Sequence, residues 1–176
     1  MIRIAIIGWG SLIWSPRELS YHGPWTPNGP ILPIEFSRIA SDGRLTLIID
    51  ENHGEMIPTW SAIARQTNLD GARKDLAARE GCPLDRIGWT ERHGIGDNMT
   101  GGVVADWCAT TGWDGAVWTQ LPSTFEERTG EPFSVAAALS YLDGLSADTQ
   151  ERAIEYIEKV PATTDTPLRR AWAARS

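Results

Sequence analysis

The order of the local sequence patterns constrains the fold more than any other feature of this chain. Patterns typical of strands fill the first part of the chain, and patterns typical of helices dominate from Pro132 onward. The expected helices in that later part cover residues 134–142, 147–159 and 167–174. Strands that precede helices favour an α+β arrangement over an alternating doubly wound sheet. The chain has no repeat and no linker, so we expect one domain over residues 1–176.

Several apolar segments in the first part have the length and alternation of strands. The expected strands cover residues 2–7, 34–40, 44–49, 57–64 and 116–119. The second and third of these flank a Ser-Asp-Gly turn and are predicted to pair as a hairpin. Residues 15–33 are rich in proline and glycine and are predicted to form a long loop. Glycines in residues 82–114 indicate loops around short strands.

A helix with good cap candidates is expected to begin near Asn68 and to end at Gly81. Glu80 therefore lies at the C-terminal end of this helix, where the partial negative charge of the helix disfavours a carboxylate. That repulsion would favour the protonated form and would suit Glu80 to proton transfer. An exposed surface glutamate without a special role is the simpler alternative.

The first predicted strand runs directly into a glycine-rich loop. Gly8 and Gly10 flank Trp9, and Ser15 followed by Pro16 prevents a regular continuation. Because glycine has no side chain, the backbone of such a loop can approach a ligand closely, and its N–H groups can hold a carboxylate or a polarised carbonyl. The loop therefore indicates a binding site at the carboxyl end of the first strand. A glycine-rich turn without a ligand is the alternative.

Composition excludes several classes of partner. The net charge is −7 and no basic run occurs, so nucleic acid is not an expected partner. The longest apolar stretch, residues 4–14, is too short to span a bilayer and lacks the flanks of a signal peptide. Cys82 and Cys108 do not make a disulfide framework. We therefore expect a cytoplasmic protein with no membrane partner and with both thiols reduced. The nine tryptophans are expected in the core or in pocket walls.

Three other site chemistries fit the sequence less well. A dinucleotide-binding fingerprint would need a third glycine at the position of Ile13. His53 and Glu55 imitate two residues of a zinc deaminase, but the pair of nearby cysteines is missing. Cys82 has no visible base or electropositive surroundings that would make it a nucleophile.

Two of these segments resemble motifs of the γ-glutamylcyclotransferase superfamily. Residues 6–14, with the sequence Ile-Ile-Gly-Trp-Gly-Ser-Leu-Ile-Trp, resemble its Tyr-Gly-Ser loop and are closest to the ChaC-like branch. Residues 68–81 resemble the segment ending in Glu-Gly that carries the catalytic glutamate of the family. Residues 59–64 lie where the family has the strand that leads into this helix. Trp9 replaces the usual tyrosine, and Leu12 replaces the asparagine of many members.

The resemblance covers residues 2–90 and implies a small mixed β-barrel with surrounding helices and a pocket at the barrel mouth. It implies an intramolecular aminolysis, in which the α-amine of a γ-glutamyl group attacks its own γ-carbonyl. The products are 5-oxoproline and a released amine, amino acid or peptide. This reaction, of the lyase or acyltransferase type, belongs to glutathione metabolism and implies no metal and no organic cofactor.

Carried over to this chain, the resemblance implies that Glu80 is catalytic and moves a proton from the attacking amine to the leaving nitrogen. The substrate-binding residues are then expected to be Gly8, Trp9, Gly10, Ser11 and Leu12. The main-chain N–H groups of the last three are expected to bind the oxyanion or the substrate carboxylate.

Three readings of the function stay open at this point. The first is an enzyme whose partner is a small γ-glutamyl substrate. The second is a non-catalytic small-molecule binding protein on the same fold, and the third is a nucleotide-binding domain. The helical C-terminal part could cover the pocket, pack a homodimer or complete the core.

Overall fold

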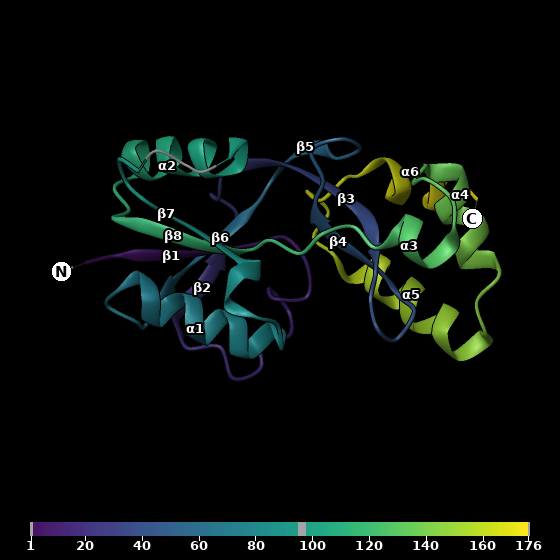
Figure 1. Cartoon of the computed structure of the whole chain (residues 1–176), viewed down its shortest axis with the longest axis horizontal. Coiled ribbons are helices and arrows are strands. Elements are labelled where there is room, and N and C mark those ends of the chain that lie inside the picture. The colour runs from purple at the N-terminus through teal and green to yellow at the C-terminus, as the bar shows by residue number, and fades with distance from the viewer. Residues whose placement is uncertain (1, 95–97, 176) are drawn as a thin grey trace. The chain divides into compact units, whose positions relative to one another are not determined.

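The computed structural model describes residues 2–94 and 98–175 and has a mixed α+β architecture (Figure 1). In this described part, a five-stranded sheet, a three-stranded sheet and six α-helices are present. The α+β class is therefore confirmed. No closed barrel is seen among the described strands, so the expected small β-barrel is not confirmed.

The chain divides into two compact units. The first unit consists of Met1–Leu32 with Pro58–Leu121, and the second consists of Pro33–Ile57 with Pro122–Ser176. The expectation of one functional domain over residues 1–176 stays a prediction. Each unit is described by itself below.

The first unit contains the five-stranded sheet. Its strands, in order across the sheet, are β2 (Tyr21–Thr26), β6 (Trp60–Ala64), β1 (Ile4–Gly8), β8 (Gly115–Thr119) and β7 (Ile87–Glu91). The central strand β1 pairs antiparallel with β6 and parallel with β8. All five residues of β1 are buried, which explains why its sequence is apolar throughout instead of alternating.

Two helices cover the two faces of this sheet. Helix α1 (Leu69–Glu80) packs on β8, β7 and β1, and α2 (Met99–Thr111) packs on β7 and β8 from the other side (Figure 1). Leu76 of α1 is fully buried in a core cluster with Ile6 of β1 and Val117 of β8. A short 3-10 turn, Leu84–Arg86, leads from α1 into β7.

The predicted caps of α1 are confirmed. The side chain of Asn68 accepts a hydrogen bond from the N–H of Gly71 at 2.7 Å, which satisfies one of the free donors at the helix start. Gly81 ends the helix with a φ of 65°, a left-handed conformation that glycine adopts without a steric penalty. The position of Glu80 in the last turn is therefore fixed by its neighbour.

The second unit contains the three-stranded sheet and the later helices. Its strands, in order across the sheet, are β4 (Leu45–Ile49), β3 (Ile31–Ile39) and β5 (Glu55–Pro58). Its helices are α3 (Phe125–Thr129), α4 (Val135–Asp143), α5 (Ala147–Lys159) and α6 (Pro167–Ala173). The predicted hairpin and the three predicted C-terminal helices are confirmed. In the described part of the chain, no helix has both the length and the apolar character that crossing a membrane requires.

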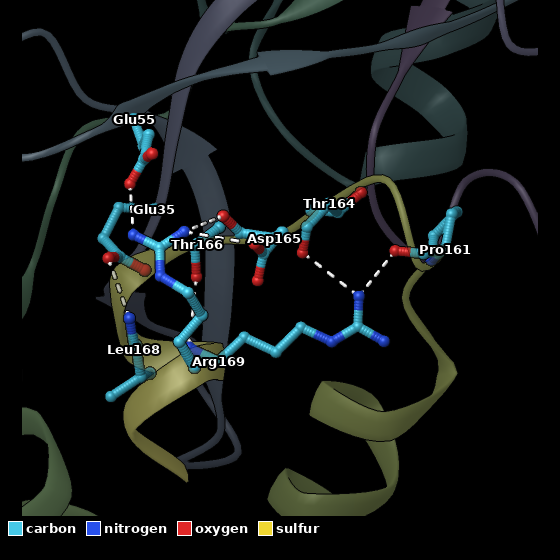
Figure 2. A network of polar contacts seen from close by, with 9 residues as sticks. Glu35, Glu55, Pro161, Thr164, Asp165, Thr166, Leu168 and Arg169 are labelled. Atoms are coloured by element: carbon cyan, nitrogen blue, oxygen red, sulfur yellow. Dashed lines mark hydrogen bonds and ion pairs between the residues drawn. The ribbon is translucent and has the colours of Figure 1, made fainter. Parts of the chain in front are cut away.

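A buried carboxyl group ties α6 to the sheet of the second unit (Figure 2). Glu35 of β3 is fully buried and accepts hydrogen bonds from the N–H of Phe36 at 2.7 Å and from the N–H of Leu168 at 3.2 Å. Burial raises the pKa of Glu35, and hydrogen bonds from the protein oppose this shift. The neighbouring Arg169 donates to the carbonyls of Pro161 and Thr164, which holds the segment before α6 in place (Figure 2).

The structure corrects several element predictions. The predicted loop over residues 15–33 contains the strand β2, an edge strand whose Gly23 and Pro24 hide it from pattern analysis. The single strand predicted over residues 57–64 is two strands, β5 and β6, separated at Thr59. The hydroxyl of Thr59 donates to the carbonyl of Pro30 at this break. The helices α2 and α3 were not predicted.

Candidate functional site

The glycine loop follows β1 as predicted and forms a tight turn in the first unit. The carbonyl of Gly10 accepts a hydrogen bond from the N–H of Ile13 at 3.0 Å, and the carbonyl of Ser11 accepts one from Ser15 at 2.8 Å. No helix begins in residues 9–20, so the dinucleotide-binding alternative lacks the helix that it requires.

The two large side chains of this loop lie in the interior. Trp9 and Leu12 are each 5% exposed, and Leu12 belongs to the core cluster around α1. Gly8 lies so close to another tryptophan that a Cβ atom there would be 3.0 Å from Cζ3 of Trp25. The loop is thus anchored by its side chains, and its backbone is the part that could contact a ligand.

The three expected main-chain donors are not used inside the fold. Among residues 2–94 and 98–175, the N–H groups of Gly10, Ser11 and Leu12 donate no hydrogen bond. These N–H groups are therefore donors that the described part of the fold leaves unused, and an anionic or polarised oxygen bound at this turn could accept hydrogen bonds from them.

Glu80 is not an open surface glutamate. Its side chain is 16% exposed, and its Oε1 atom accepts a hydrogen bond from Nη1 of Arg79 at 2.9 Å. In the described part of the chain this is the only polar contact of the Glu80 carboxylate. The second oxygen, Oε2, therefore stays available for a proton or a ligand.

Arg79 joins the two predicted parts of the site. Its side chain is 5% exposed, and Nη2 donates to the carbonyl of Ser15 at 2.6 Å and lies 3.4 Å from Oγ of Ser11. The same guanidinium holds Glu80 through Nη1. The structure thus brings the end of α1 and the glycine loop together at one buried cation. The Nε atom of Arg79 is buried and has no hydrogen-bond partner among the described residues.

The arrangement combines three chemical elements within the first unit. It contains a partly buried carboxylate with one unused oxygen, a buried guanidinium that orients it, and a nearby turn with unused main-chain donors. A carboxylate of this kind can move protons, and such donors can stabilise a developing negative charge on oxygen.

Sequence reasoning missed Arg79. Two signals were available: its helical spacing from Ala72 and Leu76, which places it on the apolar side of the helix, and its position directly before the candidate acid. An arginine on an amphipathic helix is nevertheless normally exposed. Only the packing of α1 against the loop reveals that this guanidinium is buried. Trp25, which packs against Gly8, falls in the segment predicted as a long loop and instead lies in the strand β2.

The other reactive side chains have structural partners. Nδ1 of His53 lies 3.2 Å from Oδ2 of Asp50, and Oδ1 of Asp50 accepts hydrogen bonds from the main-chain N–H groups of Asn52 and His53 in the turn between β4 and β5. Cys82 is half-buried, Cys108 is buried, and neither forms a disulfide. Burial raises the pKa of the Cys108 thiol to about 12.

A separate cavity of about 590 Å³ lies in the first unit and contains none of the predicted site residues. Asn68, Arg92 and Asp114 are among the residues that line it. Arg92 donates to the carboxylate of Asp114 at 2.8 Å and to the carbonyl of Trp113 at 2.6 Å. These contacts hold β7 to the segment before β8, so Arg92 has a structural role there.

Comparisons of the chain with protein-family models, with curated proteins and with solved structures find no match. The two motifs and the contacts between them are therefore the basis on which a function can be assigned.

Proposed function

We propose that this protein is a γ-glutamylcyclotransferase-like enzyme that converts a γ-glutamyl amine, amino acid or peptide into 5-oxoproline and a free amine. One observation carries the proposal: the buried guanidinium of Arg79 contacts both Glu80 and Ser11. These residues belong to the two segments that resemble the family, and the reaction requires an acid and an oxyanion site close together.

In the proposed reaction, Glu80 first accepts a proton from the α-ammonium group of the substrate. The free amine attacks the γ-carbonyl, which forms the ring C–N bond and a tetrahedral oxyanion. The bond to the leaving nitrogen then breaks as that nitrogen takes the proton from Glu80. The ring nitrogen still carries two protons and a positive charge, so it gives one proton to Glu80 and keeps the other as the N–H of 5-oxoproline. Glu80 then passes its proton to the released amine, which leaves as an ammonium ion and regenerates the carboxylate.

The glycine loop supplies the electrostatic part of the mechanism. The unused N–H groups of Gly10, Ser11 and Leu12 are donors for the oxyanion or for the substrate carboxylate. Because these donors are fixed by the turn, little reorganisation accompanies the charge as it develops. Holding the amine next to the carbonyl supplies a further part of the acceleration.

The proposal extends to the fold and the compartment. The central position of β1, with one parallel and one antiparallel neighbour, supports a mixed sheet of the kind that the family fold requires. We propose that residues 1–176 act as one γ-glutamylcyclotransferase-like domain on a small cytoplasmic substrate, without a cofactor.

A second candidate is a small-molecule binding protein on the same fold. Trp9, which replaces the tyrosine of the family motif, is buried and offers no phenolic hydroxyl. A site that keeps its shape but lacks this hydroxyl could bind a γ-glutamyl compound without converting it.

One experiment separates the two candidates. The protein is incubated with γ-glutamyl amines, γ-glutamyl amino acids and γ-glutamyl peptides, and 5-oxoproline is quantified by mass spectrometry. The enzyme proposal predicts release of 5-oxoproline in proportion to time and protein concentration for at least one compound. If no compound is converted but some change the tryptophan fluorescence saturably, the binding protein is the better description.

A further inference from the structure

We infer that Arg79 is a positioning residue of the proposed reaction, which fixes the Glu80 carboxylate relative to the glycine loop. The inference rests on the proposed function and adds a residue that the resemblance did not assign. Arg79 itself is not expected to contact the reacting atoms.

Arg79 lies in a buried environment. Its side chain is 5% exposed and lies on the same face of α1 as the buried Ala72 and Leu76. An apolar side chain at such a position normally packs at least as well as a buried ion pair, because burying charges requires their desolvation. A guanidinium at this position is therefore better explained by the groups that it holds than by its contribution to stability.

The guanidinium nitrogens of Arg79 donate to two different parts of the site. Nη2 is fixed by the carbonyl of Ser15, 2.6 Å away, and Nη1 donates to Oε1 of Glu80 at 2.9 Å. A guanidinium is planar and rigid, so fixing one nitrogen on the loop determines where the other nitrogen lies. The orientation of the Glu80 carboxylate is thereby coupled to the backbone of the loop.

The ion pair between Arg79 and Glu80 is unusual because the two residues are adjacent on a helix. Consecutive residues point in directions about 100° apart, and they do not normally face each other. Arg79 and Glu80 nevertheless form an ion pair in the last turn of α1. The pair engages Oε1 and leaves Oε2 unused by the described residues, so that a single oxygen is presented for proton transfer.

The experiment measures kcat and KM separately for Arg79→Gln, Arg79→Lys and a matched control, Arg73→Gln. Arg73 lies on the same helix, has an unpartnered buried Nε as Arg79 does, and stacks on Trp89 with its guanidinium 5.2 Å from the ring centre. Among the described residues, its hydrogen bonds and ion pairs include neither Glu80 nor the glycine loop. Thermal melting of each variant reports any general loss of stability.

Displacing a catalytic group by about 1 Å can cost roughly 100-fold in rate, so Arg79→Gln is expected to lower kcat by about that factor with little change in KM. Arg79→Lys is expected to give a smaller loss of kcat, because its ammonium group keeps a positive charge beside Glu80. Some loss should remain, because one ammonium group cannot hold both partners in a planar fork. Arg73→Gln is expected to keep the parent kcat.

Each other result is informative. A parent-like kcat for Arg79→Gln, or a change in KM alone, would overturn the positioning role while leaving the proposed function intact. If Arg79→Gln does not fold, Arg79→Lys decides, and a parent-like kcat for it overturns the inference. If the parent converts no γ-glutamyl compound, the proposed function fails, and the inference fails with it.

Discussion

Arg79 and Glu80 are consecutive in the chain, and their side chains form an ion pair of 2.9 Å at the C-terminal end of α1. The C-terminal end of a helix disfavours a carboxylate and favours a cation, by about 0.3–1 kcal/mol at exposed sites. The pair therefore places the favoured charge beside the disfavoured one. A carboxylate that would otherwise be repelled is held in place, partly buried, beside a loop with unused main-chain donors.

The first prediction concerns Gly10. Gly10 is buried, so the branched side chain in Gly10→Val would crowd the main-chain donors of the loop. We expect KM for the best γ-glutamyl substrate to rise several-fold. Gly102→Val is the control, because a Cβ atom at Gly102 of α2 would meet no atom within 4 Å. An unchanged KM for Gly10→Val would contradict the assignment of the loop.

The second prediction concerns packing in the first unit. A Cβ atom at Gly88 would lie 2.2 Å from Nε1 of Trp118, which is 1% exposed and cannot move aside easily. Gly88→Ala is therefore expected to lower the free energy of unfolding by about 1–3 kcal/mol. Gly102→Ala, in open space within a helix, is expected to raise it by about 0.5–1 kcal/mol. Urea denaturation measures both, and equal stabilities for the two variants would show that the packing described here is wrong.

The third prediction concerns the thiols. Cys108 is fully buried with a pKa of about 12, whereas Cys82 is half-buried. Only a thiolate reacts rapidly with a disulfide reagent, so the native protein at pH 8 should release one equivalent of thionitrobenzoate quickly. The second equivalent should appear on denaturation, and Cys82→Ser should abolish the fast one. Rapid labelling of both thiols in the native state would be the opposite result.

The fourth prediction concerns pH and the buried carboxyl of the second unit. Burial raises the pKa of Glu35 above its ordinary value of 4.5, so the folded state keeps this proton to higher pH than the unfolded state. The contribution of Glu35 to stability is then full below pH 4.5 and is lost as the pH rises through the folded-state value. Each pKa unit by which the folded state differs from the unfolded state corresponds to about 1.4 kcal/mol in the free energy of unfolding.

Glu35→Gln tests this sign, because glutamine does not titrate. The variant should be less stable than the parent at every pH, since its amide cannot accept all the hydrogen bonds of the carboxyl group. The difference in the free energy of unfolding between the parent and Glu35→Gln should become smaller as the pH rises from 4 to 8, because only the parent loses the contribution of a protonated Glu35. The exposed Glu127→Gln should show no such trend, and a gap that widens with pH would refute the assignment.

The helices and strands that were predicted correctly are marked by local sequence features, which are either single capping residues or a short run of apolar or alternating residues. The apolar run of β1, the hairpin of β3 and β4, and the caps Asn68 and Gly81 all have local causes. The elements that it missed lack such signals. Gly101 and Gly102 weaken the helical pattern of α2, and Gly23 and Pro24 interrupt β2, which lies at a sheet edge where proline is tolerated.

The site was predictable only as two separate pieces. The glycine loop and Glu80 each have a local signature, but the contact between them depends on the packing of α1 against the turn after β1. The helical spacing of Arg79 from Ala72 and Leu76 places it on the inner side of α1, but only the packing shows that its guanidinium stays buried there and contacts the loop. The burial of Glu35 likewise results from the docking of α6 on β3, a contact between distant parts of the chain.

The central claim is that Glu80 carries the proton in an aminolysis next to the glycine loop. Its most direct test is kcat for Glu80→Gln on the best γ-glutamyl substrate, with the exposed Glu91→Gln as control. Glutamine is close in shape to glutamate, so the melting temperature of Glu80→Gln should stay close to that of the parent. Because glutamine cannot take the proton of the amine, turnover by Glu80→Gln should be almost abolished. The control Glu91→Gln should keep the activity of the parent. Turnover by Glu80→Gln at the parent rate would contradict the account.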